Sequence, residues 1–463
     1  MTARLSSGSE RIDQVLGGGF LANGINLVIG RPGSGKTILC EQYVFHNATT
    51  ERPAMYLSTV SEPLDKMLRY GQSLEYFDKS AIGSRVFYED LGRHLNDNGL
   101  AGVLDRVIAL LRERRPGVVV IDSFKALRDY AEGTGEFRRF LHELAGRLSV
   151  LAVTSFWVGE YERESMGAPE FAVADAIVSL SVERTAEREM RVLQVLKLRG
   201  SHFLSGKHAY RISAKGVEVF PRLADDVNTD SYEASFERIS SGVAPLDVML
   251  FDGYLQGAST LVAGPSGSGK TLLGLHFLMT GARLGEPGLI ATLQENPIQL
   301  ERILNGYRWS LKEPGLDLMY RMPVDLYVDE WVYDLLDAIE RTGAKRVLID
   351  SLGDLHATGI EELRFREYMY SLLQRCSRNG VSVMMTQEVP ELFGVTQLSE
   401  YGISHLSDNV VLLQFLLDNS DVKRAISVIK TRGTAHDSQI RQFEITGGGF
   451  VLDEASPATK GLS

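Results

Sequence analysis

Short apolar runs alternate with longer amphipathic stretches along the whole chain. In the first half, the apolar run at residues 27–29 precedes a glycine-rich loop, and residues 38–45 follow that loop with helical spacing. The run at 118–121 is followed by a helix-like stretch, and residues 150–154 predict a further buried strand. Apolar strands that are separated by helices are typical of a parallel sheet covered on both faces. The pattern therefore predicts α/β nucleotide-binding domains.

The same pattern occurs twice, which predicts a duplicated domain. The loop Gly30-Arg-Pro-Gly-Ser-Gly-Lys-Thr37 returns as Gly264-Pro-Ser-Gly-Ser-Gly-Lys-Thr271. A Ser-Gly pair upstream, an apolar strand that ends in Asp-Ser, and a Lys-x-Arg-Gly segment return in the same order. Residues 223–233 are polar and suit an interdomain linker. We predict a first domain at 1–224, a linker at 225–236 and a second domain at 237–463.

Both glycine loops fit the pattern G-x-x-x-x-G-K-[ST] between a predicted strand and a predicted helix, the context that a phosphate loop requires. In such a loop, backbone N–H groups surround the phosphates, the lysine neutralises phosphate oxygens, and the hydroxyl ligates Mg²⁺. We therefore expect ATP and Mg²⁺ as cofactors. The predicted nucleotide-binding residues are Gly33, Ser34, Gly35, Lys36 and Thr37, and in the second half Gly267, Ser268, Gly269, Lys270 and Thr271.

Two aspartates complete the predicted magnesium sites. Asp122 and Asp350 each end an apolar run, and a strand end presents a carboxylate to the magnesium shell. Thr37 with Asp122, and Thr271 with Asp350, are the predicted metal ligands. A single aspartate of this kind could merely terminate a strand, but its recurrence after a phosphate loop favours the metal role.

Hydrolysis also needs a group that orients or deprotonates the attacking water. Glu62 and Glu295 follow the next predicted strand in their respective halves, in the segments Ser-Glu-Pro and Gln-Glu-Asn-Pro. Each is predicted to project toward the γ-phosphate as a catalytic carboxylate. The alternative is a surface glutamate that caps the following helix.

Composition narrows the class of protein. A chain of 463 residues with 44% apolar and 24% charged residues allows two or three globular domains. Its net charge of −11 argues against a nonspecific grip on nucleic acid. Cys40 and Cys376 are too few for a disulfide framework or a zinc site and favour a reducing cytoplasm. Because no window approaches about 18 uninterrupted apolar residues, we expect a soluble cytoplasmic protein without a membrane segment.

These residues resemble the KaiC family of double-domain RecA-type ATPases, which includes the circadian-clock protein of cyanobacteria. The resemblance rests on the two phosphate loops, the two Asp-Ser strands, the Lys-x-Arg-Gly segments and the stretch at 429–445. It implies two tandem RecA-like P-loop NTPase domains, each a mostly parallel sheet covered by helices. It also implies a homohexamer of two stacked rings with ATP at the subunit seams.

The resemblance gives a role to two cations near the end of each half. Lys197, Arg199, Lys430 and Arg432 would reach the γ-phosphate of the neighbouring subunit as catalytic residues. Cations two residues apart on a strand point to one face, which suits a group acting on another subunit. The alternative is a solvated pair on an edge strand.

The chain departs from the family pattern at three places. Ser61 and Gln294 stand where the family has a second glutamate. The family's autophosphorylation segment is matched by Ser404, a candidate phosphoacceptor, and by Ser399 at another hydroxyl position, but His405 replaces the adjacent threonine. The alternative for Ser404 is a helix-capping or buried serine. The short tail argues against KaiA-type regulation, and docking of a KaiB-like partner is left open.

Three functions remain in view. The first is a slow ATPase that serves as a switch or timer, with serine autokinase activity as an addition. The second is a RecA- or DnaB-like DNA motor, which the acidic segments after 153 and 387 disfavour because they repel phosphate. The third is a pseudo-ATPase scaffold that binds nucleotide as a structural staple.

Overall fold

A computed structural model describes residues 3–59, 64–161, 167–185, 188–223, 235–324, 326–358, 361–391, 403–418 and 421–452. The chain divides into two compact units, Met1–Asp225 and Asp226–Ser463. Most of the predicted linker, residues 225–234, lies outside the described residues, so the bounds at 224 and 237 stay predictions. Each unit is described by itself.

The first unit is built on a nine-stranded sheet in the order β11-β10-β9-β8-β3-β7-β6-β4-β5. The strands from β8 to β5 pair in parallel, and β9, β10 and β11 return antiparallel. Its elements are β1 Arg4–Leu5, α1 Glu10–Val15, β2 Phe20–Leu21, β3 Ile25–Gly30, α2 Lys36–Asn47, β4 Ala54–Ser58, α3 Leu64–Gly71, β5 Val86–Asp90, α4 Gly92–Arg114, β6 Val118–Asp122, α5 Thr134–Val150, β7 Thr154–Gly159, α6 Pro169–Val173, β8 Ala176–Thr185, β9 Arg188–Leu198, β10 His208–Ser213 and β11 Gly216–Phe220, with 3₁₀ turns at Lys79–Ala81 and Lys125–Tyr130.

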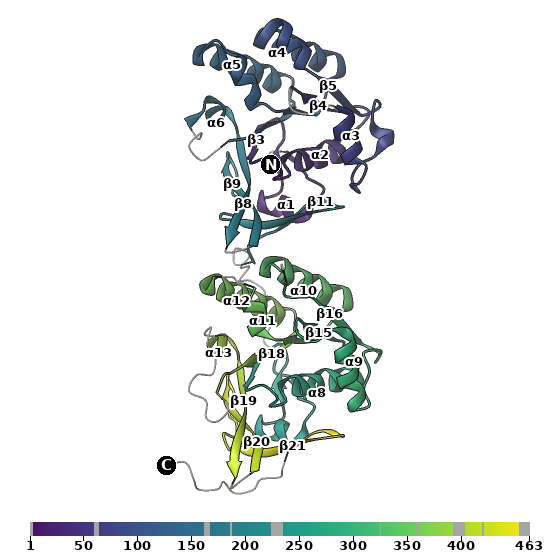
Figure 1. Cartoon of the computed structure of the whole chain (residues 1–463), viewed down its shortest axis with the longest axis vertical. Helices are drawn as coiled ribbons and strands as arrows, with labels where there is room; N and C mark the ends of the chain where they lie inside the picture. Colours follow the sequence, from purple (N-terminus) through teal and green to yellow (C-terminus); the bar gives the residue numbers. More distant parts are fainter. Residues whose placement is uncertain are drawn as a thin grey trace. The chain divides into compact units, whose positions relative to one another are not determined.

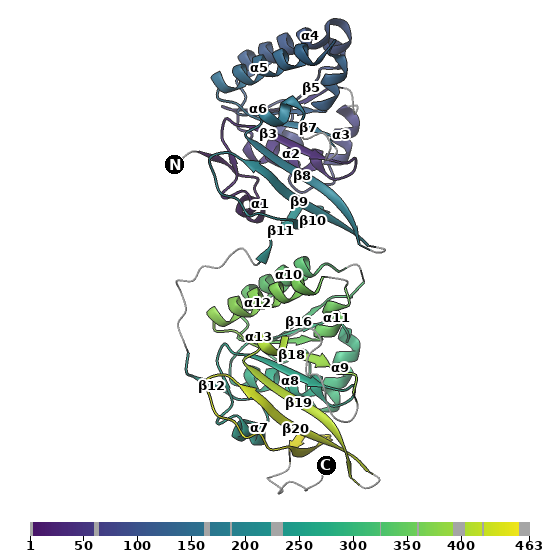
Figure 2. The same ribbon diagram turned by 90° about the vertical axis from the view of Figure 1, so that its left-hand side faces the viewer.

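The second unit repeats this sheet as β16-β15-β17-β18-β14-β19-β20-β21-β22. Figure 2 shows the long antiparallel strand pair within each sheet, β8 with β9 and β19 with β20. Its elements are β12 Arg238–Ile239, α7 Ala244–Met249, β13 Tyr254–Leu255, β14 Ser259–Gly264, α8 Lys270–Arg283, β15 Gly288–Thr292, α9 Pro297–Gly306, β16 Leu316–Tyr320, α10 Val328–Thr342, β17 Arg346–Asp350, α11 Leu352–His356, α12 Glu362–Arg378, β18 Ser382–Glu388, α13 Ile403–Leu406, β19 Asn409–Asp418, β20 Asp421–Thr431, β21 Arg441–Thr446 and β22 Gly449–Leu452.

Each sheet is covered on both faces, because successive side chains of a strand point to opposite sides. In β3, Val28 belongs to the core beneath α2, whereas Leu27 and Ile29 belong to the core beneath α4 and α5. Figure 1 shows α4 and α5 together on one side of the first sheet and α2 on the other. The predicted fold class, tandem α/β domains with mostly parallel sheets, is confirmed.

The strand predicted at 150–154 is wrong. Helix α5 continues to Val150, and the strand β7 begins only at Thr154. Val150 is 84% exposed at the end of the helix, so its apolar side chain does not belong to the core. The apolar run spans a helix end and a turn, and hydrophobicity alone does not separate a helix end from a short strand.

Candidate nucleotide site

The two glycine loops have the backbone geometry of a phosphate cradle. They follow the central strands β3 and β14 and lead into α2 and α8, so a helix N-terminus faces the loop. Gly33 and Gly35 have φ of 73° and 87°, and Gly267 and Gly269 have φ of 73° and 106°. Only glycine adopts this left-handed region readily, so the glycines of the motif are required by the loop's shape.

The loop lysines lie at the mouth of each cradle. The Lys36 ammonium donates to the carbonyl oxygens of Gly30 and Arg31 at 3.0 and 2.9 Å, and Lys270 makes the same two bonds in its own loop. Burial lowers the pKa of both lysines, and nearby carboxylates act in the opposite direction. Because burial disfavours the charged form of these lysines, an anion bound beside the ammonium groups would stabilise that form by a direct charge contact.

The predicted magnesium ligands meet in both units. Thr37 Oγ1 donates to Asp122 Oδ2 at 3.0 Å, and Thr271 Oγ1 donates to Asp350 Oδ2 at 2.9 Å. A hydroxyl and a carboxylate oxygen at a phosphate loop are ligands that Mg²⁺ accepts, so the residues present fit the ion. Burial raises the pKa of Asp350, and a bound cation would favour its charged form.

The sequence reasoning missed the side chains that orient the two aspartates. Tyr56 O–H donates to Asp122 Oδ2 at 2.5 Å, and Thr386 O–H donates to Asp350 Oδ1. Tyr56 lies in β4, whereas Thr386 lies in β18, so the units support the same carboxylate from different strands. The sequence signal for these two residues is that each is a hydroxyl side chain within a buried strand.

Of the two candidate catalytic glutamates, the structure describes only Glu295. Glu62 lies outside the described residues. Glu295 follows β15, is partly exposed, and donates its backbone N–H to Thr292 Oγ1 at 3.2 Å. The helix cap that was its alternative role belongs to Asn296, whose side chain accepts from the N–H groups of Ile298 and Gln299. The carboxylate of Glu295 is therefore not used to begin α9.

A second carboxylate faces the loop lysine in each unit. Glu160 follows β7, and its Oε1 lies 3.9 Å from Lys36 Nζ. Glu388 ends β18 and raises the pKa of Lys270 against the effect of burial. From the sequence these residues were interpreted only as acidic loop positions. Their place beside the phosphate loops makes them further candidates for handling the attacking water.

The two Lys-x-Arg cations of each unit lie at the end of an inner strand, β9 or β20, on the side of the sheet where the central strand β3 or β14 begins. Arg199 N–H donates to Asp175 O, and Asp175 N–H donates to Ile25 O, so Arg199 is level with the start of β3. In the second unit Arg432 is level with Ser259, the start of β14, through Asp408. The phosphate loop follows the other end of each strand, five residues from the arginines, which is about 17 Å at about 3.3 Å per residue. Lys197 and Lys430 are level with Leu27 and Leu261, about 10 Å before the loop.

Backbone carbonyls at this end of the strands hold the cations. Lys197 Nζ donates to Phe171 O at 3.0 Å, and Lys430 Nζ donates to Ser407 O at 2.7 Å and Ser404 O at 3.1 Å. Burial and a neighbouring arginine lower the pKa of both lysines. The arginine side chains remain 55% and 58% exposed beside Asp175 and Asp408. The arginines therefore remain accessible to a ligand that comes from outside the unit.

Of the two phosphoacceptor candidates, Ser399 lies outside the described residues. Ser404 is in the short helix α13 and is half-buried, while His405 is exposed. Since Lys430 binds the Ser404 carbonyl, Ser404 lies at the same end of the strands as the cations. It is therefore far from the phosphate loop of its own unit.

Comparison with known proteins identifies the family. The family description "ATPase: KaiC" matches residues 5–224 and again residues 239–456. The chain belongs to the KaiC family. It is 28% identical to the circadian clock oscillator protein KaiC of Picosynechococcus sp. over 96% of this chain and 89% of that protein. The KaiC of Prochlorococcus marinus subsp. pastoris is 29% identical over 98% of this chain and 91% of that protein.

Membership of this family makes the chain an ATPase with two nucleotide-binding domains, as the sequence predicted. A third relative, KaiC 1 of Synechocystis sp., is 28% identical over 95% of this chain and 87% of that protein. Among the described residues of this KaiC-family protein, none of the helices is long and apolar enough to cross a membrane.

Proposed function

We propose that this chain is a slow ATPase switch that works as a nucleotide-joined homohexamer of two rings. The observation that carries the proposal is the separation of about 17 Å along the central strand between each phosphate loop and the arginine of the same unit, Arg199 or Arg432. An arginine side chain cannot span that distance to its own γ-phosphate. The same cations become useful if the neighbouring subunit presents its nucleotide to this end of the strands.

Each seam then divides the chemistry between two subunits. One subunit supplies the glycine loop, the lysine, and the threonine–aspartate pair that would hold Mg²⁺; bound there, the ion would neutralise charge on the phosphates. The other subunit supplies Lys197 and Arg199, or Lys430 and Arg432, which stabilise charge on the γ-phosphate. Glu62 and Glu295, with Glu160 and Glu388 beside the lysines, are the proposed carboxylates for the attacking water.

Assembly can be tested by native mass spectrometry. With Mg·ATP we expect a hexamer. Arg199→Ala should lower hydrolysis at the first-domain sites by roughly 1,000-fold, since an arginine acting in trans contributes about that much. The rate is measured in a Lys270→Met background, so that the second-domain sites do not contribute. The matched control is Arg147→Ala, an exposed arginine paired with Glu143 on α5. A monomer at saturating Mg·ATP, or equal rates in Arg199→Ala and the control, would contradict the proposal.

We extend the proposal to a single autophosphorylation site, Ser404. Its support is the position of the serine beside Lys430, where a neighbouring subunit's γ-phosphate would lie. Phosphoryl transfer needs an in-line hydroxyl, a magnesium clamp and a proton acceptor, and Glu295 is the proposed acceptor. Because His405 offers no second hydroxyl, an ordered two-site cycle is not expected. Ser399 is the secondary candidate.

Labelling with γ-³²P-ATP tests this site. We expect slow incorporation at one dominant position, lost in Ser404→Ala and in Glu295→Gln and retained in Ser149→Ala, an exposed serine of the first domain. An unlabelled protein that releases phosphate at a steady rate would reduce the chain to a plain ATPase. If Ser404→Ala is still labelled, Ser404 is not the phosphorylated residue, and Ser399 is the next residue to replace.

The names of the relatives support a timing role, and a KaiB-like protein is the corresponding candidate partner. A DNA motor is less well supported, since Glu160 and Glu388 place negative charge at the ends of β7 and β18, next to the phosphate loops. Such charge repels the phosphates of DNA. A scaffold that binds nucleotide without hydrolysing it would release no phosphate. Measurable release of phosphate therefore distinguishes the switch from such a scaffold.

A further inference from the structure

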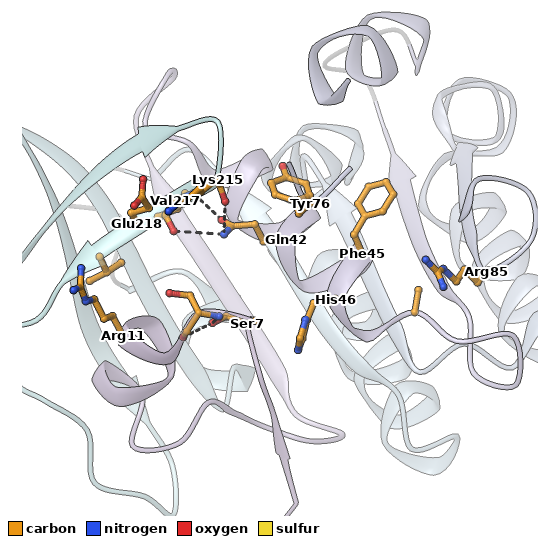
Figure 3. A pocket seen from close by; sticks show the side chains of 14 residues that line it. Ser7, Arg11, Gln42, Phe45, His46, Tyr76, Arg85, Lys215, Val217 and Glu218 are labelled. Atoms are coloured by element: carbon orange, nitrogen blue, oxygen red, sulfur yellow. Dashed lines mark hydrogen bonds between the residues drawn. The ribbon is translucent and has the colours of Figure 1, made fainter. Parts of the chain in front are cut away.

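The first unit contains a cleft that is not part of the nucleotide site described above. Its volume is about 550 Å³, within the range of small-molecule pockets. The floor is the second half of α2, with Gln42, Phe45 and His46. Residues 7–11 and 215–219 form one wall, and Tyr76 and Arg85 belong to the other (Figure 3).

The cleft is displaced along α2 from the phosphate loop. Gln42 and His46 lie six and ten residues after Lys36, which is about 9 and 15 Å along a helix axis. Its walls are tied to the helix and to each other. Gln42 Oε1 accepts from Val217 N–H at 2.8 Å, and Glu75 N–H donates to Ala214 O at 2.7 Å. The cleft is therefore formed by fixed elements.

The charge around the cleft is mostly positive, in a chain whose net charge is −11. Arg11, Arg85 and Lys215 line it, and Figure 3 shows Arg11 and Arg85 at opposite ends with Phe45 and Tyr76 between them. Glu218, the one carboxylate among the described residues that line the cleft, is engaged by Arg211 at 3.1 Å and by the Ser213 hydroxyl. Arg85 Nη2 bonds Asp78, while its buried Nε has no hydrogen-bond partner among the described residues.

Apolar surface lies between the cations. The rings of Phe45 and Tyr76 are 5.9 Å apart, and Phe77 packs behind Phe45 at 5.0 Å. A flat apolar body can lie against such rings, while guanidinium and ammonium groups bind phosphate oxygens. We propose that this cleft is a second ligand site, which binds a small aromatic phosphate of the size of a nucleoside monophosphate.

The described part of the second unit lacks the matching features, although it keeps the same scaffold. His276 takes the place of Gln42 and accepts from Phe450 N–H at 2.9 Å, as Gln42 does from Val217. Trp309 lies edge-on against His276 with ring centroids 4.7 Å apart. By the repeat, Pro245 and Gly448 stand where the first unit has Arg11 and Lys215. The ligand site therefore belongs to the first domain alone, and it does not depend on hydrolysis or assembly.

Isothermal titration with adenosine 5′-monophosphate tests the site in the full chain, with both phosphate loops saturated by Mg·ATPγS. We expect one AMP per chain. Because the single phosphate of AMP can meet the cation of only one wall, either Lys215→Gln or Arg85→Gln should weaken binding by about tenfold. Lys215 is exposed, so its replacement should not disturb folding. The control Arg138→Gln removes the same charge from an exposed position on α5 and should bind as the unaltered chain does.

Inorganic phosphate provides the second arm and should bind at least about tenfold more weakly than AMP, since it lacks the ring that meets Phe45 and Tyr76. Equal binding of the two would overturn the assignment of an aromatic ligand. The site itself is overturned if no AMP binds beyond the ATPγS sites, if added Mg·ATPγS displaces AMP competitively, or if the two cleft variants match Arg138→Gln.

Discussion

Lys36→Met is expected to abolish nucleotide-dependent ring assembly, whereas Lys270→Met should leave assembly and remove phosphoryl transfer to the second domain. Both lysines are largely buried and bound to two carbonyls at the mouth of their loop. Truncating one partner of a buried charge contact costs about 3 kcal/mol, or roughly 100-fold in affinity. Each variant should therefore weaken ATP binding at its own loop by about that factor.

The division between the domains follows from where the other residues lie. The candidate phosphoacceptor Ser404 belongs to the second domain, so label should depend on Lys270. Because the two loops share one geometry, each variant is the matched control of the other. Native mass spectrometry measures assembly, and γ-³²P-ATP measures transfer. Variants that behave alike in both assays would show that the domains share their tasks.

The second large effect concerns stability. Arg346→Met is expected to destabilise the second domain by about 3 kcal/mol, because it breaks a buried charge network. Arg346 is fully buried at the start of β17. Its Nε donates to Glu286 at 2.6 Å, and its Nη1 donates to the carbonyls of Ser240 and Phe277 at 2.8 Å each. Its guanidinium carbon also lies 4.7 Å from the Phe277 ring centroid.

Scanning calorimetry of the full chain measures this effect. For a domain of this size, about 3 kcal/mol lowers the midpoint of unfolding by roughly 6–12 °C. The first domain has Val118 at the corresponding strand position, so its own transition should not move. Arg341→Met is the control, since its pair with Asp317 is 64% exposed on the arginine side and such pairs contribute below about 1 kcal/mol. Equal shifts in the two variants would contradict the role given to burial.

The residues that bind the two metal-site aspartates could not be predicted from the sequence, although the aspartates could. Asp122 and Asp350 were predicted as metal ligands because each ends an apolar strand after a phosphate loop. Tyr56 and Thr386, which bind those aspartates, come from different strands in the two units. No repeat in the sequence relates them, because each is brought to its aspartate by sheet pairing rather than by its neighbours in the chain.

The features that could be predicted from the sequence are those formed by neighbouring residues of the chain. A phosphate loop is a contiguous segment whose glycines are required by its own φ angles, and its second occurrence revealed the duplication. The position of each residue at one end or the other of the strands depends on how the strands pair. Arg199 and Arg432 directly follow strands that return antiparallel, and this return takes them away from the phosphate loops. The tertiary structure also forms the cleft over α2, because β11 and the Tyr76 loop are distant in sequence and meet only through strand pairing and packing.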